Sequence, residues 1–167
     1  MNKYLLDVYN PFKVEFLYGK GSTLFDKKGN DYIDFTSGIG VSCLGHGNKK
    51  LVETISKQAK KFLHLSNIYP INTQEECAKK VAALSGYKNM QGFFCNSGAE
   101  ANETAIKFIR KYAKSKGIKK HNIITLENSF HGRTIATLNA TGQKDKQLGF
   151  EPFPNEFIYA KNLEDTK

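Results

Sequence analysis

The order of predicted elements in the second half of the chain constrains the fold more than any other feature. Helical periodicity over 73–86 is followed by a β-rich apolar run at 90–95, a helix at 98–116 and a strand at 122–127. A short helix and a strand at 156–160 complete the series. Alternating helices and strands form a mostly parallel sheet with flanking helices, so the fold class is α/β. A parallel sheet is normally buried on both faces, so we expect this short one to be incomplete.

The N-terminal part has a different pattern. Residues 14–36 contain short apolar runs separated by two turns rich in Gly, Lys and Asn, which predicts short paired strands. Residues 37–47 are rich in Gly and are expected to be irregular and buried, and an amphipathic helix is predicted over 48–64. We therefore expect three parts: a strand and loop segment of a small α+β domain (1–47), a connecting helix and loop (48–72), and the first, truncated part of a large α/β domain (73–167).

Composition excludes several classes of protein. The chain has 167 residues, 40% of them hydrophobic, which is enough for the core of one ordinary domain. It has no apolar run long enough to span a bilayer and no signal-peptide pattern, so we expect a cytoplasmic protein without membrane contact. Its three cysteines lie far apart, and its histidines lack ligand spacing, so neither disulfides nor a metal site are expected.

The net charge of +9 raises the question of a nucleic-acid partner. The lysines occur as scattered doublets on predicted helices, as on a solvated face, and no RNA-binding or zinc-finger signature accompanies them. We expect no nucleic acid, although a non-catalytic basic binding module remains the alternative from another class. Only Arg110 and Arg133 are arginines among the 25 basic side chains. The planar guanidinium of Arg can bind a carboxylate with two parallel hydrogen bonds, which Lys cannot do. Each of the two arginines is therefore a candidate for a specific role.

The sequence NSGAEANE marks the junction between a predicted strand and a predicted helix. Ser97 and Glu100 have the spacing of a capping box, which by itself indicates only a helix start. The first N–H groups of a helix have no internal partner and lie at its positive end, where a phosphate binds well. Gly98 and Ala99 are small enough to let a phosphate reach the backbone. Glu100 and Glu103 would repel a phosphate that they faced, so the prediction requires both carboxylates to point elsewhere.

A second group, FHGRT, follows the next predicted strand. Taken alone, it is explained by a surface turn with a packed Phe130. Together with a phosphate site, the aromatic ring and the carboxylate-binding fork of Arg133 suggest a flat phosphorylated cofactor beside an amino-acid substrate. Arg110 has no such context and is expected to be a surface residue.

These motifs are specific. FCNSGAEANETAIKFIRKYA followed by SFHGRT resembles the class III, pyridoxal-phosphate-dependent aminotransferases, and DKKGNDYIDFTSGIGVSCLGHG with HLSNIYP is similar to their acetylornithine branch. The resemblance covers essentially the whole chain and implies fold type I of the pyridoxal-phosphate enzymes. It implies that the N–H groups of Gly98 and Ala99 hold the cofactor phosphate, that Phe130 stacks on the pyridine ring, and that Arg133 binds the substrate α-carboxylate. It also implies amino-acid and 2-oxo-acid substrates and a homodimer.

The resemblance also implies what this chain lacks. The Schiff-base lysine of the family lies beyond residue 167, so we expect no catalytic residue here and no activity from this chain alone. GHGNKK stands where family members often have G-H-x-H-P, which predicts a changed entry into the following helix. Ile39 stands where ornithine aminotransferases have Tyr, and an apolar residue suits an acylated amino group. This favours acetylornithine over ornithine, and other class III donors stay as alternatives, namely succinylornithine, succinyldiaminopimelate, ornithine and 4-aminobutyrate.

Overall fold

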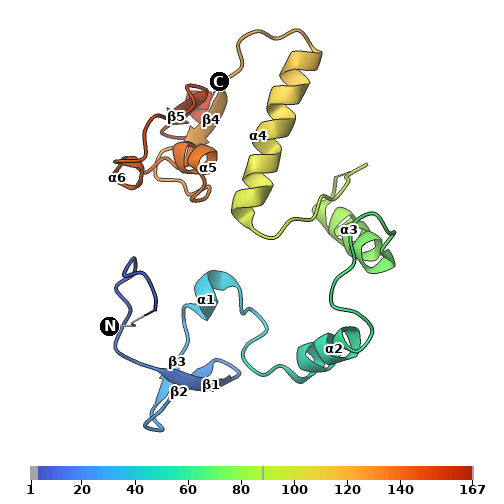
Figure 1. The fold of residues 1–167 in the computed structure, drawn as a ribbon, viewed down its shortest axis with the longest axis vertical. Coiled ribbons are helices and arrows are strands. Elements are labelled where there is room, and N and C mark those ends of the chain that lie inside the picture. Colours follow the sequence, from blue (N-terminus) through green and yellow to red (C-terminus); the bar gives the residue numbers. More distant parts are fainter. Residues whose placement is uncertain (1–3, 88, 167) are drawn as a thin grey trace. The chain divides into compact units, whose positions relative to one another are not determined.

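The computed structural model describes residues 4–87 and 89–166. The chain forms two compact units, one ending at Pro70 and the other beginning at Ile71 (Figure 1). The finer division into three parts, with boundaries after residues 47 and 72, stays a prediction.

A three-stranded antiparallel sheet forms the centre of the first unit. Its strands run in the order β1, β2, β3, with the bounds Phe16–Lys20, Thr23–Asp26 and Asp31–Ile33. Gly21 and Ser22 form the two-residue turn between β1 and β2, and Gly21 takes the left-handed φ of +57° that such turns need. Tyr18 stacks on Phe25 across the two strands at 4.6 Å between ring centroids. The strands predicted over 14–36 are thus confirmed.

The segment 37–47 is irregular, as predicted, but it is not buried. Its only helical turn, α1 (Ser37–Gly40), contains left-handed residues, with φ of +63° at both Gly38 and Ile39. Ile39 is 95% exposed and Val41 is 79% exposed. The prediction of burial is wrong here, because none of the described elements of this unit covers these apolar side chains.

Helix α2 (Lys49–Ala59) follows, and it begins where Asn48 caps it. The Asn48 side-chain oxygen accepts a hydrogen bond from Leu51 N at 3.1 Å, which satisfies one of the free N–H groups of the first turn. The amphipathic helix is confirmed, although it ends five residues before the predicted position at 64.

Two long helices open the second unit. Helix α3 (Asn72–Ser85) ends at Gly86, whose left-handed φ of +73° closes the helix. Helix α4 (Gly98–Ser115) ends in the same manner before Gly117, with φ of +68°. Both helices confirm the sequence prediction to within about a residue at each end.

The sheet of the second unit is parallel and smaller than predicted. Strand β4 (Ile123–Leu126) pairs in parallel with β5 (Phe157–Ala160), which confirms the α/β class. The strand predicted at 90–95 does not form, since among the described residues no strand lies beside it to complete its hydrogen bonds.

Three short elements accompany β4 and β5 in this unit. They are α5 (Ile135–Ala140), α6 (Lys144–Gln147) and a 3₁₀ turn (Glu164–Thr166). The first of them, α5, packs between α4 and α6 (Figure 1). The apolar core is made by α4, α5 and β5 and consists of Ile106, Ala113, Leu138, Ala140 and Ala160. None of the helices within 4–87 and 89–166 has the length and apolarity that a bilayer crossing requires.

Candidate functional site

The beginning of α4 is capped and open. Ser97 has extended backbone, and its Oγ accepts a hydrogen bond from Glu100 N at 3.1 Å. The N–H groups of Gly98 and Ala99 precede the first intrahelical bond, and no acceptor in the described part of the chain takes them. A β-carbon added to Gly98 would meet no atom within 4 Å. Two donors at the positive end of a helix are therefore accessible to an anion.

The two carboxylates near this helix start are held elsewhere. Glu100 Oε2 accepts hydrogen bonds from Asn96 N at 2.6 Å and from Asn96 Nδ2 at 3.0 Å. The Glu103 carboxylate accepts a short hydrogen bond from the Thr134 hydroxyl. Among the described residues, neither carboxylate accepts a hydrogen bond from the N–H groups of Gly98 and Ala99, so these two donors stay available to a phosphate.

The turn after β4 exposes an aromatic ring and a guanidinium next to each other. The Phe130 side chain is 59% exposed, and the guanidinium carbon of Arg133 lies 5.2 Å from its ring centroid. At this distance the cation is attracted to the ring face. Both groups remain open to solvent and could be engaged by a ligand.

The structure brings the two predicted groups together. Asn102 Nδ2, in the second turn of α4, donates to His131 O at 2.8 Å. Gly132 packs directly on α4, because a β-carbon on it would lie 2.9 Å from the Ala99 Cβ. With the hydrogen bond between Glu103 and Thr134, these contacts fix the turn against the first two turns of α4. Gly98, Ala99, Phe130 and Arg133 therefore belong to one region, and their individual roles stay predictions.

Two buried hydroxyls support this turn, and the sequence interpretation did not identify them. Thr137 and Thr141 are fully buried. Thr141 Oγ1 accepts a hydrogen bond from His131 N at 3.0 Å and donates one to Thr137 O at 2.9 Å. The signal was present in the sequence as threonines at positions 134, 137 and 141, which share one face of a helix.

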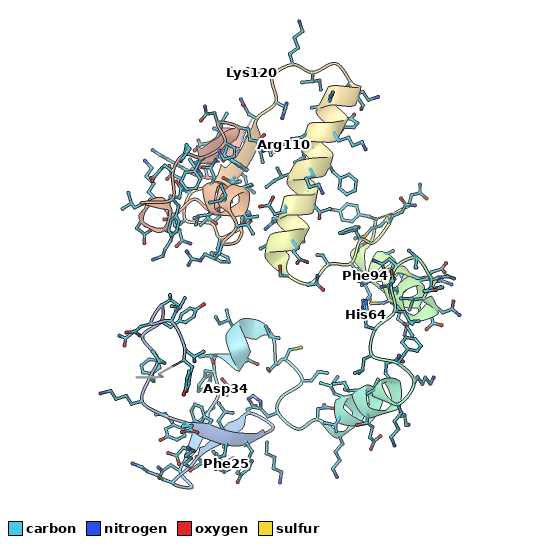
Figure 2. All side chains as sticks on the ribbon, viewed as in Figure 1. Phe25, Asp34, His64, Phe94, Arg110 and Lys120 are labelled. Atoms are coloured by element: carbon cyan, nitrogen blue, oxygen red, sulfur yellow. The ribbon has the colours of Figure 1, made fainter. Side chains whose placement is uncertain are left out.

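Arg110 is a surface residue, as the sequence predicted, and it forms an ion pair there. Its Nε lies 3.0 Å from both carboxylate oxygens of Glu156, and its Nη2 also donates to Glu156 (Arg110 is labelled in Figure 2). The Glu156 carboxylate, by accepting these bonds, raises the pKa of Arg110. Glu156 directly precedes β5, so this ion pair lies at the opposite end of the parallel strands from Phe130. Arg110 therefore ties α4 to the sheet outside the candidate site.

Comparison with known proteins extends these observations. Residues 7–167 match the family described as aminotransferase class-III. The chain is 52% identical to the acetylornithine aminotransferase of Wolinella succinogenes over 164 residues, which is 97% of this chain and 42% of that protein. It is 48% identical to the acetylornithine aminotransferase of Aquifex aeolicus, over 95% of this chain and 42% of that protein. The chain thus spans less than half the length of these relatives.

Solved structures show the same fold. The ornithine aminotransferase of Toxoplasma gondii superposes with a TM-score of 0.87 and 28% identity, over 96% of this chain and 38% of that one. The N-acetylornithine aminotransferase of Stenotrophomonas maltophilia superposes with a TM-score of 0.71 and 34% identity, over 90% of this chain and 35% of that one. The Toxoplasma structure has pyridoxal phosphate at partial occupancy in its active site.

The residues of this chain fit that cofactor. Its phosphate needs donors at an uncrowded helix start, and the N–H groups of Gly98 and Ala99 provide them. Its flat ring needs an aromatic surface nearby, and Phe130 is exposed in the turn that packs on α4. Since the sequence matches along nearly its whole length and the structural relatives share the fold, the chain belongs to the class III family of pyridoxal-phosphate-dependent aminotransferases.

Proposed function

We propose that this chain is the N-terminal part of an acetylornithine aminotransferase. The full-length enzyme would move an amino group between N2-acetylornithine and 2-oxoglutarate. The observation that carries the proposal is the 52% identity to the Wolinella acetylornithine aminotransferase over 97% of the chain. The match extends over both units, so it spans the candidate cofactor site and the irregular segment 37–47.

The role of α4 and its neighbours is to bind and orient the cofactor. Pyridoxal phosphate, when bound, supplies the electron sink that amino-group transfer requires. The N–H groups of Gly98 and Ala99 donate to its phosphate, while Ser97 keeps the helix start in place. Phe130 provides a face for its ring, and the packing of Gly132 on Ala99 fixes the distance between ring and phosphate contacts.

Arg133 binds the α-carboxylate of both substrates. 2-Oxoglutarate carries its α-carboxylate next to the reacting carbon. N2-Acetylornithine donates its δ-amino group and carries its α-carboxylate at the other end of the molecule, beside the acylated nitrogen. Each substrate thus offers one α-carboxylate, and the same guanidinium serves in both half-reactions. A planar fork holds such a group with two parallel hydrogen bonds and thereby fixes its orientation. The guanidinium is exposed and held mainly by the Phe130 ring, so it is available to a substrate.

The choice of amino donor rests on Ile39. Its side chain is 95% exposed on a left-handed backbone, and its apolar surface suits an acylated amino group better than a charged one. This favours N2-acetylornithine over ornithine. The other class III donors, succinylornithine, succinyldiaminopimelate and 4-aminobutyrate, are separated by the substrate panel below.

The remaining parts of the enzyme are proposed from the family. The lysine that bonds to the cofactor lies beyond residue 167, so residues 1–167 alone are inactive. The full-length enzyme is a cytoplasmic homodimer. Its mass in solution, measured by light scattering, tests the dimer independently of activity.

The function is tested on the full-length protein loaded with pyridoxal phosphate. We expect 2-oxoglutarate-dependent turnover with N2-acetylornithine, and kcat/KM at least tenfold lower with ornithine, succinylornithine, succinyldiaminopimelate and 4-aminobutyrate. Higher kcat/KM with one of these donors would reassign the substrate within class III. A full-length protein that does not bind pyridoxal phosphate, and that binds DNA in a salt-sensitive manner, would instead support the basic binding module. Residues 1–167, expressed alone, serve as the inactive control.

A further inference from the structure

A single carboxylate joins the two ends of the segment 36–46. Asp34 Oδ1 accepts hydrogen bonds from Ser37 N at 2.8 Å and from Thr36 N and Oγ1 at 3.1 Å and 2.9 Å. Asp34 Oδ2 lies 2.8 Å from Nε2 of His46 at the other end. The Asp34 side chain itself is only 7% exposed, and its bonds to Ser37 and His46 are partly buried, whereas those to Thr36 lie at the surface. We call Asp34 and His46 the clasp (Asp34 is labelled in Figure 2).

His46 is itself fixed to the sheet. Its main-chain N–H donates to Gly21 O at 2.8 Å, and its carbonyl accepts from Gly21 N at 2.9 Å. Its ring lies over Gly19, where a β-carbon would be 2.5 Å from His46 Cγ. Because an ionised carboxylate only accepts, the His46 Nε2 carries the proton and donates to Asp34. The clasp therefore connects the segment to the turn between β1 and β2.

The segment that the clasp closes is strained. Four consecutive residues have left-handed φ, at +48° for Ser37, +63° for both Gly38 and Ile39, and +77° for Gly40. This region is unfavourable for residues with a β-carbon, above all for a β-branched one, and it persists only where the surroundings impose it. The most direct restraint is at the start of the run, where Asp34 accepts the hydrogen bond from Ser37 N.

We propose that Asp34 and His46 are positioning residues that hold segment 36–46 in its left-handed form and thereby present Ile39 to the acyl end of the amino donor. The proposal rests on the proposed function for the identity of that donor. Neither member of the clasp needs to touch the substrate, because each acts through the backbone of the segment. Without the clasp, the exposed run relaxes toward ordinary backbone angles, and the apolar contact of Ile39 is lost for most of the population.

The test compares three variants of the full-length enzyme. His46→Leu removes the donor, and His46→Gln keeps an amide N–H that reaches the position of Nε2. Asp31→Asn is the matched control, since this exposed carboxylate on β3 forms no hydrogen bond or ion pair among the described residues. Two quantities are measured: amide hydrogen exchange of residues 37–44, and the separate values of kcat and KM.

For His46→Leu we expect at least tenfold faster exchange in 37–44. We also expect at least a fivefold rise in KM for N2-acetylornithine, with kcat and the KM for 2-oxoglutarate within twofold of wild type. His46→Gln should restore most of the wild-type exchange rate and of the wild-type KM for the donor. Asp31→Asn should leave both at their wild-type values. If His46→Leu does not fold, Asp34→Asn is measured in its place with the same expectations.

An unchanged rate of amide exchange in residues 37–44 of His46→Leu would show that Asp34 and His46 do not hold the segment. Faster exchange with an unchanged KM for the donor would overturn the positioning role and leave a merely structural one. A wild-type enzyme that does not accept N2-acetylornithine overturns the proposed function and the donor contact with it, whereas the exchange comparison still decides whether the clasp holds the segment.

Discussion

Gly132 lies so close to Ala99 that a β-carbon on the glycine would be 2.9 Å from the alanine β-carbon. It would come still closer to the hydroxyl of Thr137, which is fully buried and unable to move aside without losing its hydrogen bonds. Gly132 also has a φ of +140°, which residues with a β-carbon rarely adopt. This contact fixes the turn after β4 against the start of α4.

Gly132→Ala should therefore destabilise the full-length protein by about 3 kcal/mol, from overpacking and backbone strain together. The free energy of unfolding in urea measures this loss. Gly117→Ala is the matched control, because Gly117 has φ of +68° but open space around a β-carbon, and it should lose only about 1 kcal/mol. Equal losses in the two variants would show that the contact with Ala99 contributes nothing.

Ser97→Asp separates helix capping from phosphate binding. Asp caps a helix about as well as Ser, so the free energy of unfolding should change by less than about 0.5 kcal/mol. The added negative charge beside the N–H groups of Gly98 and Ala99 should raise the dissociation constant of pyridoxal phosphate at least tenfold, measured by absorbance titration of the apoprotein. Ser97→Ala should give the reverse, a loss of about 1 kcal/mol in stability with a smaller change in cofactor affinity. If the cofactor affinity changed in parallel with the free energy of unfolding in both variants, Ser97 would act only as a helix cap and not as part of the phosphate site.

Arg133→Ala should raise KM for both N2-acetylornithine and 2-oxoglutarate, by roughly ten- to a hundredfold, since a charge-assisted hydrogen bond contributes about 1.5–3 kcal/mol. Arg133→Lys should recover little, because Lys lacks the planar fork. Lys107→Ala, which removes an exposed cation from α4, controls for a general loss of positive charge. Unchanged steady-state kinetics for Arg133→Ala would remove this residue from the substrate site.

The ion pair between Arg110 and Glu156 should contribute to stability without affecting the reaction. The Arg110 side chain is 45% exposed and that of Glu156 is 13% exposed, so water screens the attraction in part. A double-mutant cycle of Arg110→Ala and Glu156→Gln should give a coupling energy of about 1 kcal/mol in urea unfolding. Values of kcat and KM for both single variants should stay within twofold of wild type. A change in KM larger than that would place the pair in the functional site.

Asp34 should make stability depend on pH in the acid range. Hydrogen bonds, first from His46 and then from Ser37 and Thr36, lower the pKa of the Asp34 carboxyl from 3.8 to about 2. A carboxyl with a depressed pKa in the folded state stabilises above its unfolded pKa and loses that contribution as the pH falls. The stability advantage of wild type over Asp34→Asn should therefore be present above pH 3.8 and decline from there toward pH 2. Asp31→Asn should differ from wild type by the same small amount throughout, and a parallel decline in that variant would remove Asp34 as the cause.

The sequence predicted elements that are determined by local signals. Helix α4 has a cap at Ser97, a stop at Gly117 and regular apolar spacing between them, and the structure reproduces all three. The short strands of the first unit are bounded by glycine turns and were predicted for the same reason. The candidate site residues were likewise chosen from two local motifs, NSGAEANE and FHGRT, and their roles stay predictions.

What the sequence did not predict depends on contacts between distant residues. The strand expected at 90–95 needs a neighbour that the described residues do not supply, and no local pattern reports this. Arg110 was correctly placed at the surface, but its ion pair was not predicted because its partner Glu156 is 46 positions away. The link between Glu103 and Thr134 likewise joins residues 31 positions apart, and only the folded chain shows it.

The contacts that join α4 to the turn after β4 all fall within one continuous stretch, from Asn96 to Thr141. A ribosome finishes this stretch before it reaches the last strand of the second unit. Under the proposed function, the groups that hold the cofactor phosphate and the substrate carboxylate are neighbours in the nascent chain before the lysine that bonds to the cofactor has been synthesised. This half of the site is then encoded by a single contiguous block of the gene, and recombination that exchanges the block between relatives transfers it intact.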